Sequence, residues 1–365
     1  MDSRADAIPP DLFGRRDKDR FLTVMTGIAD VYTRLLPRFG RVEEPEPVVD
    51  RELRLVVAQR RVEAEGVVSL TLAAAAGGEL PRWQPGCHLD LHLASGLRRQ
   101  YSLCGDPADR KHYRIAVRRL DAAGGGSREV HDVLTEGSPI TVRGPRNAFP
   151  LVLTGPTLFL AGGIGITPIL PMAREAARRG VDWRVVYTGR SRDSMPFQDE
   201  LAQLAEMSGN HPDRVLVRPN DEFGIPDPAW LLADAPRGGA VYVCGPRRML
   251  TGVRETFADC AATALHYERF SPPPVVDGTP FELELARSGT VLAVPADRPA
   301  LDVLIDARPD VAYSCRQGFC GTCKVRVLAG EADHRDRRLT DDQRAAGDML
   351  ICVSRAHGDR LVLDL

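Results

Sequence analysis

Hydrophobic and polar positions alternate in short stretches between residues 51 and 153. Four stretches contain period-two alternation: LRLVVAQ, VVSLTLA, HLDLHLA and YRIAVRRL, with Gly and Pro between them. Alternation of that period places one set of side chains in a core and the other in solvent, which is typical of antiparallel strands. Residues 51–153 are therefore predicted to form a small antiparallel β-barrel.

From residue 157 the pattern changes to fully apolar strands that alternate with helical segments. The strands are TLFLAGG, WRVVYTG, RVLVRP and AVYVCGP, and the helices are PILPMAREAARRG, FQDELAQLAEM and RRMLTGVRETFADC. This rhythm predicts a parallel sheet with crossover helices over residues 154–270. The Pro-rich segment SPPPVVDGTP then predicts a linker over 271–280, and short strands such as FELELA and LVLDL return in a last domain over 281–365.

The first fifty residues carry a different pattern. Apolar residues recur at i, i+3, i+4 and i+7 between Phe21 and Phe39, which predicts an amphipathic helix within an extension over residues 1–50. The helix either packs on its own protein or serves in docking or dimerisation.

Composition narrows the function. The 365 residues have room for two or three domains, and a net charge of −2 gives no general attraction to nucleic acid or membrane. No run of 18 apolar residues predicts a membrane span, and the amino terminus is unlike a signal peptide. We therefore expect a cytoplasmic protein, in which clustered thiols bind metals or act in catalysis more often than they form disulfides.

Three of the eight cysteines stand within nine residues of one another. Cys315, Cys320 and Cys323 have the spacing C-x4-C-x2-C, and Cys352 follows after 28 further residues. Plant-type ferredoxins hold a 2Fe-2S cluster with this arrangement of thiolates. Four cysteines also bind zinc, but usually as two separate C-x2-C pairs. The spacing therefore favours an iron–sulfur cluster with these four ligands.

A glycine turn joins the first apolar strand of the second domain to a helix. In AGGIGITP, Gly162, Gly163 and Gly165 let the backbone approach a pyrophosphate, and Thr167 is placed to cap the helix. Pro168 stands where the standard dinucleotide fingerprint has its last glycine. The segment predicts a nucleotide site, with an ordinary strand-to-helix turn as the alternative.

A second turn follows another buried strand. Cys244, Gly245 and Pro246 in VYVCGP come at the strand's carboxyl end, the edge at which open parallel sheets bind ligands. We expect them near the first turn, with Cys244 either lining a nicotinamide pocket or packing in the core.

Two segments of the predicted barrel carry groups that suit a flavin. In RRQYSLCGDP, Arg99 can pair with a phosphate, Tyr101 can lie against a ring and Ser102 can hydrogen-bond a ring atom. In AAGGGSREVHDVL, the run Gly125, Gly126 and Ser127 opens a helix whose start suits a phosphate. Taken singly, each is also an ordinary barrel residue.

Together these motifs resemble a known family. RQYS, GGS, GPRNAFPL, AGGIGITP, CGP and the cysteine loop, in this order, resemble the phthalate dioxygenase reductase family, which includes vanillate demethylase reductases. The resemblance spans residues 51–365. It implies a multidomain α+β and α/β protein with an antiparallel flavin-binding β-barrel, a parallel-sheet NAD-binding domain and a β-grasp 2Fe-2S ferredoxin domain, preceded by the N-terminal helical extension.

The resemblance also implies roles for individual residues. Arg99 and the Gly126–Ser127 turn are expected to contact the phosphate of FMN, and Tyr101 and Ser102 its ring. The segment PRNAFP favours FMN, although FAD stays open on physical grounds. Two further residues resemble family positions close to the flavin: Phe270, an aromatic residue, and Glu268, its polar neighbour.

The implied activity is electron transfer. NADH delivers two electrons at once and the cluster accepts one at a time, a mismatch that a flavin resolves. We expect an NADH-dependent reductase that serves a separate oxygenase or demethylase, with catalytic positions at Ser102, Cys244, Glu268 and Phe270. The oxygenase is Rieske-type or a haem monooxygenase, and a cluster-based redox sensor is the alternative from another class. Arg190 and Arg192 follow the second sheet strand, near where a 2′-phosphate could lie, yet the resemblance favours NADH.

Overall fold

The computed structural model describes residues 52–120, 125–209, 214–270, 275–308, 311–313, 316–318 and 321–365. The amphipathic helix expected between Phe21 and Phe39 lies outside these ranges, so the helix and both of its interpretations stay predictions. Within the described ranges, no helix is both long and apolar enough to cross a membrane.

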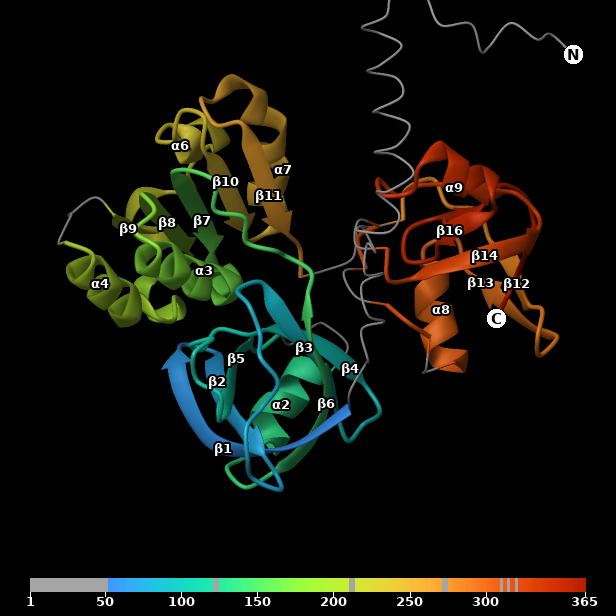
Figure 1. The fold of residues 1–365 in the computed structure, drawn as a ribbon, viewed down its shortest axis with the longest axis horizontal. Coiled ribbons are helices and arrows are strands. Elements are labelled where there is room, and N and C mark those ends of the chain that lie inside the picture. Colours follow the sequence, from blue (N-terminus) through green and yellow to red (C-terminus); the bar gives the residue numbers. More distant parts are fainter. Residues whose placement is uncertain are drawn as a thin grey trace, which may run out of the picture. The chain divides into compact units, whose positions relative to one another are not determined.

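The first described domain is the predicted barrel, drawn in blue and green in Figure 1. Its strands are β1 (Glu52–Ala64), β2 (Val67–Ala74), β3 (Cys87–His92), β4 (Arg98–Ser102), β5 (His112–Arg118) and β6 (Pro139–Asn147), with helix α2 (Gly126–Val133). All neighbours are antiparallel, in the order β4-β3-β6-β1-β2-β5. A bridge between Leu103 and Ile115 closes the sheet. The prediction of an antiparallel barrel is confirmed.

Strand β6 departs from the sequence expectation. None of the four stretches of alternation includes it, and it runs through the segment GPRN to Asn147. Ile140 and Val142 alternate into the core as a strand requires, but Gly144 and Pro145 then interrupt the pattern and resemble a turn. Pairing with β1 ends at Arg143, and pairing with β3 alone, through His88 with Arg146 and Cys87 with Asn147, continues the strand past these residues.

The second domain is a doubly wound α/β domain, in which five parallel strands alternate with helices. The strands are β7 (Thr157–Gly162), β8 (Trp183–Gly189), β9 (Val215–Pro219), β10 (Ala240–Cys244) and β11 (Ala264–Glu268). The helices are α3 (Ile166–Arg178), α4 (Gln198–Met207), α5 (Asn220–Phe223), α6 (Pro228–Leu232) and α7 (Arg247–Thr256). The strand order β11-β10-β7-β8-β9 reverses direction between β7 and β10. Such a switch point opens a crevice at the carboxyl ends of the strands.

The third domain has the expected β-grasp form, in which a mixed sheet packs on a helix. Its strands are β12 (Phe281–Leu285), β13 (Thr290–Val294), β14 (Lys324–Ala329), β15 (Ala332–Asp333), β16 (Asp348–Leu350), β17 (Arg355–Ala356) and β18 (Arg360–Leu363), with helices α8 (Ala300–Ala307) and α9 (Asp341–Ala345). The main sheet has the order β13-β12-β18-β14-β16, with β12 and β18 parallel. Leu301 and Leu304 of α8 complete its core.

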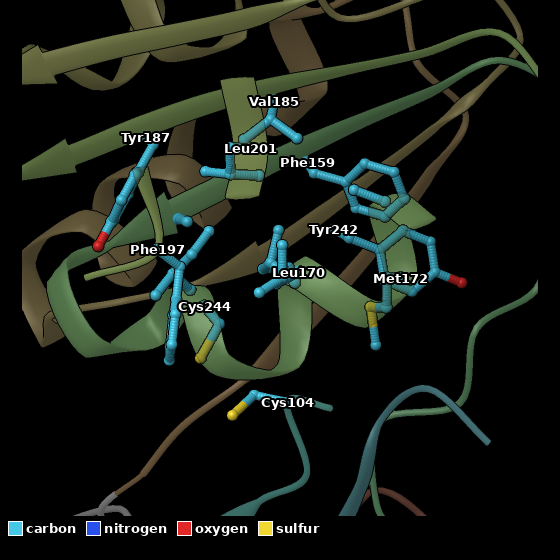
Figure 2. Packing of buried hydrophobic residues seen from close by; sticks show 14 of the residues in the cluster. Cys104, Phe159, Leu170, Met172, Val185, Tyr187, Phe197, Leu201, Tyr242 and Cys244 are labelled. Atoms are coloured by element: carbon cyan, nitrogen blue, oxygen red, sulfur yellow. The ribbon is translucent and has the colours of Figure 1, made fainter. Parts of the chain in front are cut away.

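One buried cluster is shared by the barrel and the α/β domain. It joins Val67, Cys104 and Phe149 of the barrel segment to Tyr242 and Cys244 of β10, and Figure 2 shows the side chains of Cys104, Tyr242 and Cys244 within it. The rings of Phe149 and Tyr242 have centroids 5.5 Å apart. Because these residues leave water together, the two domains are coupled by apolar burial.

A cluster of charged groups reinforces this coupling. Glu200 of α4 accepts hydrogen bonds of 2.7 and 2.8 Å from Arg114 of β5, and it also pairs with Arg174 of α3. Both guanidinium groups reach the carbonyl oxygen of Cys104, at 3.0 and 3.5 Å. A bidentate arginine pair of this kind fixes geometry as well as adding energy. The relative orientation of barrel and α/β domain is thereby constrained.

Candidate functional site

A cavity of about 660 Å³ lies between the barrel and the carboxyl edge of the parallel sheet. Its walls bring together ten of the residues predicted from the sequence: Arg99, Tyr101, Ser102, Ser127, Gly162, Gly165, Thr167, Gly245, Pro246 and Phe270. These residues come from segments as much as 170 positions apart in the chain. The predicted flavin and nucleotide sides therefore face one cavity.

The barrel side of this cavity is built to hold an anion. Helix α2 starts after Gly125, which has a φ of +76°, a conformation that glycine adopts without strain. A Cβ on Gly126 would lie 2.6 Å from Cγ of Arg99, so the arginine side chain crosses the start of the helix. The free N–H groups and dipole of the helix and the guanidinium group all favour negative charge there. This arrangement fits the phosphate of a flavin nucleotide.

Ser127 and Ser102 have partners in the structure that their sequence context did not indicate. The Ser127 hydroxyl accepts a hydrogen bond of 3.1 Å from the N–H of Leu120, which ties the start of α2 to the segment after β5. The Ser102 hydroxyl lies 3.5 Å from Oε2 of Glu268, at the end of β11. Phe270, two residues further on, is 50% exposed at the cavity wall. Ser102, Ser127 and Phe270 thus line the cavity, and Glu268 lies behind Ser102.

Glu268 is a buried carboxyl group, 7% exposed. Burial raises its pKa from 4.5 to about 8, and the hydrogen bond with Ser102 opposes this rise. At neutral pH the group is therefore mainly protonated, so it holds a proton next to the Ser102 hydroxyl. A neutral acid at this place can donate a hydrogen bond or a proton into the cavity region.

We expect the Glu268→Gln variant to change how stability depends on pH. Above about pH 4.5 the unfolded chain gives up the Glu268 proton, whereas the folded protein keeps it up to about pH 8. The free energy of unfolding of the wild type is therefore highest below pH 4.5 and declines as pH rises to about 8. Glutamine stays neutral at every pH. The free energy of unfolding of the variant should therefore rise relative to that of the wild type by about a few kcal/mol between pH 4.5 and pH 8. Thermal unfolding midpoints at pH 5 and pH 8 test this. Parallel shifts of both proteins with pH would contradict it.

The two turns on the α/β side are packed so closely that a side chain at Gly162 or Gly165 would clash with the other turn. A Cβ on Gly162 would lie 2.5 Å from Cδ of Pro246, and one on Gly165 would lie 2.2 Å from the carbonyl oxygen of Cys244. Gly163 has a φ of +54°, a conformation that favours glycine. The prediction that the two turns lie together is confirmed, and the glycines serve their mutual packing.

Thr167 differs from expectation, and Cys244 takes the second of the two positions expected for it. Thr167 does not cap the helix, because α3 begins at Ile166 and the Thr167 hydroxyl donates a 3.0 Å hydrogen bond to the carbonyl of Ile164. Cys244 is 1% exposed and faces the buried cluster, whereas Gly245 and Pro246 line the cavity. Burial raises the pKa of its thiol well above the usual value. A catalytic role for Cys244 stays a prediction, but its side chain is not part of the cavity wall.

Five further arginines line the cavity, and none of them is among the residues predicted from the sequence: Arg98, Arg118, Arg247, Arg269 and Arg316. Arg118, at the end of β5, has Nη1 3.7 Å from the position that a Cβ on Gly163 would take. It therefore brings positive charge to the glycine turn, where a pyrophosphate would be favoured. No sequence signal marked it, because arginines are abundant throughout the chain.

The third domain brings two of the four predicted cluster ligands together. Lys324 of β14 pairs with Leu350 of β16, so Cys323 and Cys352 lie at the same end of this strand pair. The N–H of Ile351 donates to the carbonyl of Cys323 at 3.4 Å. Both cysteines are 2% exposed. Cys315 and Cys320 lie outside the described residues, so their placement stays a prediction.

The described part of the cysteine loop fits a cluster. Gly318 and Gly321 have φ values of +79° and +84°, which let the loop turn tightly. A Cβ on Gly318 would lie 2.7 Å from Cγ2 of Val353, so the loop rests on the segment that follows Cys352. Buried thiols held at one strand end next to such a loop suit iron–sulfur ligation.

Comparison with known proteins agrees with this geometry. A family described as "2Fe-2S iron-sulfur cluster binding domain" matches residues 283–357, and "Oxidoreductase NAD-binding domain" matches residues 159–255. Vanillate O-demethylase oxidoreductase from a Pseudomonas species is 40% identical over 321 residues, covering 86% of this chain and all of the relative. The structure of phthalate dioxygenase reductase is 37% identical with a TM-score of 0.65, covering 86% of this chain and 98% of that one. The chain belongs to the phthalate dioxygenase reductase family.

Membership of the phthalate dioxygenase reductase family gives the activity. The chain is a flavoprotein oxidoreductase with an NAD-binding domain and a 2Fe-2S domain, and its relatives are reductase components of oxygenase and demethylase systems. A further solved structure, an intact type IV self-sufficient cytochrome P450 monooxygenase, is 38% identical with a TM-score of 0.69. That match covers 91% of this chain and 44% of the other.

Proposed function

We propose that the flavin is FMN and that the barrel wall of the cavity holds it. Arg99 and the Gly126–Ser127 start of α2 would bind the phosphate, because a guanidinium group crosses a helix amino terminus there. Tyr101 and Ser102 of β4 would lie along the ring. The observation that carries the proposal is the single cavity that joins these residues to the glycine turns.

A bound flavin accepts two electrons together and gives them up one at a time. The chain's own residues supply the rest. Gly162, Gly165 and Gly245 would let the backbone approach the NADH pyrophosphate, with Arg118 adding positive charge. Glu268, protonated at neutral pH, would hold a proton beside Ser102 at the reacting end of the cavity. Phe270 would cover that end from solvent.

Identification of the released flavin tests this proposal. The purified protein is heated and the supernatant is separated by chromatography against FMN and FAD standards. FMN in an amount equal to protein supports the assignment. FAD would show that the anion site at α2 holds only part of a larger nucleotide, and absence of any flavin would contradict the proposed function.

We further propose that an ion pair at the sheet edge favours NADH over NADPH. Arg192, which follows β8, has Nε 2.7 Å and Nη2 3.1 Å from the carboxylate of Glu222 in α5. Asp221 donates its N–H to the carbonyl of Arg190 at 3.0 Å. With Glu222 present, Arg192 is neutralised and a carboxylate faces the region where a 2′-phosphate would lie, which disfavours NADPH.

The Glu222→Gln variant is therefore expected to raise kcat/KM for NADPH relative to NADH by about tenfold. The measurement is ferricyanide reduction at varied concentrations of each nucleotide. Asp234→Asn is the control, because Asp234 forms a comparable 2.7 Å pair with Arg184 at the start of β8, the opposite end of that strand. An unchanged nucleotide ratio in Glu222→Gln would contradict this assignment.

The partner is proposed to be a Rieske-type oxygenase. The similarity to a self-sufficient cytochrome P450 supports a haem monooxygenase as the second candidate. Cytoplasmic location is proposed from cysteines placed for metal binding. Delivery of electrons from NADH to purified oxygenases of each type distinguishes the two partners.

A further inference from the structure

The segment GPRNAFP favours FMN by family resemblance, and neither Arg146 nor Asn147 of this segment belongs to the cavity wall. The Asn147 side chain donates 3.2 Å to the carbonyl of Pro85 and accepts 3.1 Å from the N–H of Phe149, so it shapes the end of β6. Arg146 is directed toward the ferredoxin domain.

Arg146 is held by a buried carboxylate. Asp90 of β3 is 2% exposed, and its Oδ2 lies 2.9 Å from Nη1 of Arg146, whose side chain is 11% exposed. Removing two such charges from water costs about as much as their attraction returns, so a buried pair is weak evidence for a role in stability. The ion pair does, however, orient the side chain, because Asp90 fixes the direction in which the guanidinium group of Arg146 points.

That direction is toward the cysteine loop. Nη1 of Arg146 donates 2.5 Å to the carbonyl of Tyr313, and its guanidinium carbon lies 5.9 Å from the centre of the Tyr313 ring. Tyr313 is 5% exposed and stands two residues before Cys315. On the other side of that cysteine, the Gln317 amide donates 3.0 Å to the carbonyl of Arg269 in the cavity wall. The segment with the first predicted ligand is thus anchored at both ends.

We propose that Asp90 and Arg146 are positioning residues that hold the cysteine loop at a fixed distance from the flavin cavity. The step they would support moves one electron from the reduced flavin to the oxidised cluster, with NADH as the source of electrons. Electron transfer rates fall steeply with distance, so a loop released from Arg146 would accept electrons more slowly. The inference rests on the proposed function of the cavity.

The test separates two half-reactions by rapid mixing with NADH under anaerobic conditions. In Arg146→Gln, flavin bleaching is expected to stay within about twofold of the wild type, while cluster reduction slows about tenfold or more. A second readout is hydrogen exchange of the peptide spanning 311–318, which should become faster in the variant. Equal changes in both half-reactions, or unchanged exchange at 311–318, would overturn the inference.

Arg146→Gln leaves Asp90 buried without its partner, so the variant is paired with a second one. Asp90→Leu combined with Arg146→Met removes both charges and keeps similar volumes, which proteins often tolerate. This double variant should fold, retain flavin and show the same slow cluster reduction. Normal cluster reduction in it would refute the positioning role.

Two control variants should leave cluster reduction close to the wild-type rate. Tyr313→Phe keeps the backbone carbonyl that accepts from Arg146, so its cluster reduction should stay near the wild-type rate. Arg178→Gln removes an exposed pair with Glu175 on α3, away from the loop, and should change neither half-reaction. Failure of the proposed function would look different, since the wild-type flavin itself would then not be reduced by NADH.

Discussion

Replacement of Cys352 by serine is expected to remove the iron–sulfur cluster and to stop electron delivery to the oxygenase. Cys352 is 2% exposed and lies beside Cys323 at the end of the β14–β16 pair, so no water or neighbouring group replaces the lost thiolate easily. Iron content should fall to background, and cytochrome c or oxygenase reduction should fall about 100-fold. Iron analysis, the visible spectrum and NADH-driven reduction measure this.

The loss of activity in Cys352→Ser should be confined to electron transfer beyond the flavin. Ferricyanide reduction, which draws electrons from the flavin, is expected to persist in Cys352→Ser. Cys260→Ser is the matched control, because Cys260 is a half-buried free cysteine of the α/β domain. Full iron content in Cys352→Ser, or zinc in place of iron in the wild type, would contradict the assignment of the cysteines.

The second large effect is expected for Gly165→Ala. Its Cβ would lie 2.2 Å from the carbonyl oxygen of Cys244, a backbone atom that cannot move without displacing the turn after β10. Overpacking of this kind costs about 1–3 kcal/mol, and it separates the two turns that line the nucleotide side of the cavity. Flavin reduction by NADH should slow by about 100-fold in rapid mixing.

Gly155→Ala provides the control for a glycine-to-alanine change. A Cβ at Gly155 would meet nothing within 4 Å, so stability and flavin reduction should stay close to the wild type. A normal rate of flavin reduction in a folded Gly165→Ala protein would show that close approach of the two turns is not needed for the reaction.

The architecture followed from the sequence because pattern and motif agreed within each domain. Period-two alternation gave the barrel strands, and the strand-to-helix glycine turn gave the start of a parallel sheet. The cysteine spacing identified the ferredoxin domain. Strand β6 is not among the predicted strands: its second half contains the turn residues Gly144 and Pro145, and pairing with β3 continues the strand past them.

The site was predictable where a motif marked it and unpredictable where only packing did. Ten predicted residues line the cavity. The side chain of Cys244 does not, because Tyr242 and Cys244 share one face of β10 and that face meets the barrel core. Arg118 and the pair of Asp90 with Arg146 depend on contacts between distant segments, which local sequence does not encode.

We infer that one chain carries electrons from NADH through a flavin to a 2Fe-2S cluster. Anaerobic titration of the purified protein with NADH, followed by absorbance and by electron paramagnetic resonance at low temperature, tests it directly. The flavin should bleach and the signal of a reduced 2Fe-2S cluster should grow in, with flavin and cluster in equal amounts. A bleached flavin with no cluster signal, or a spectrum that NADH leaves unchanged, would contradict it.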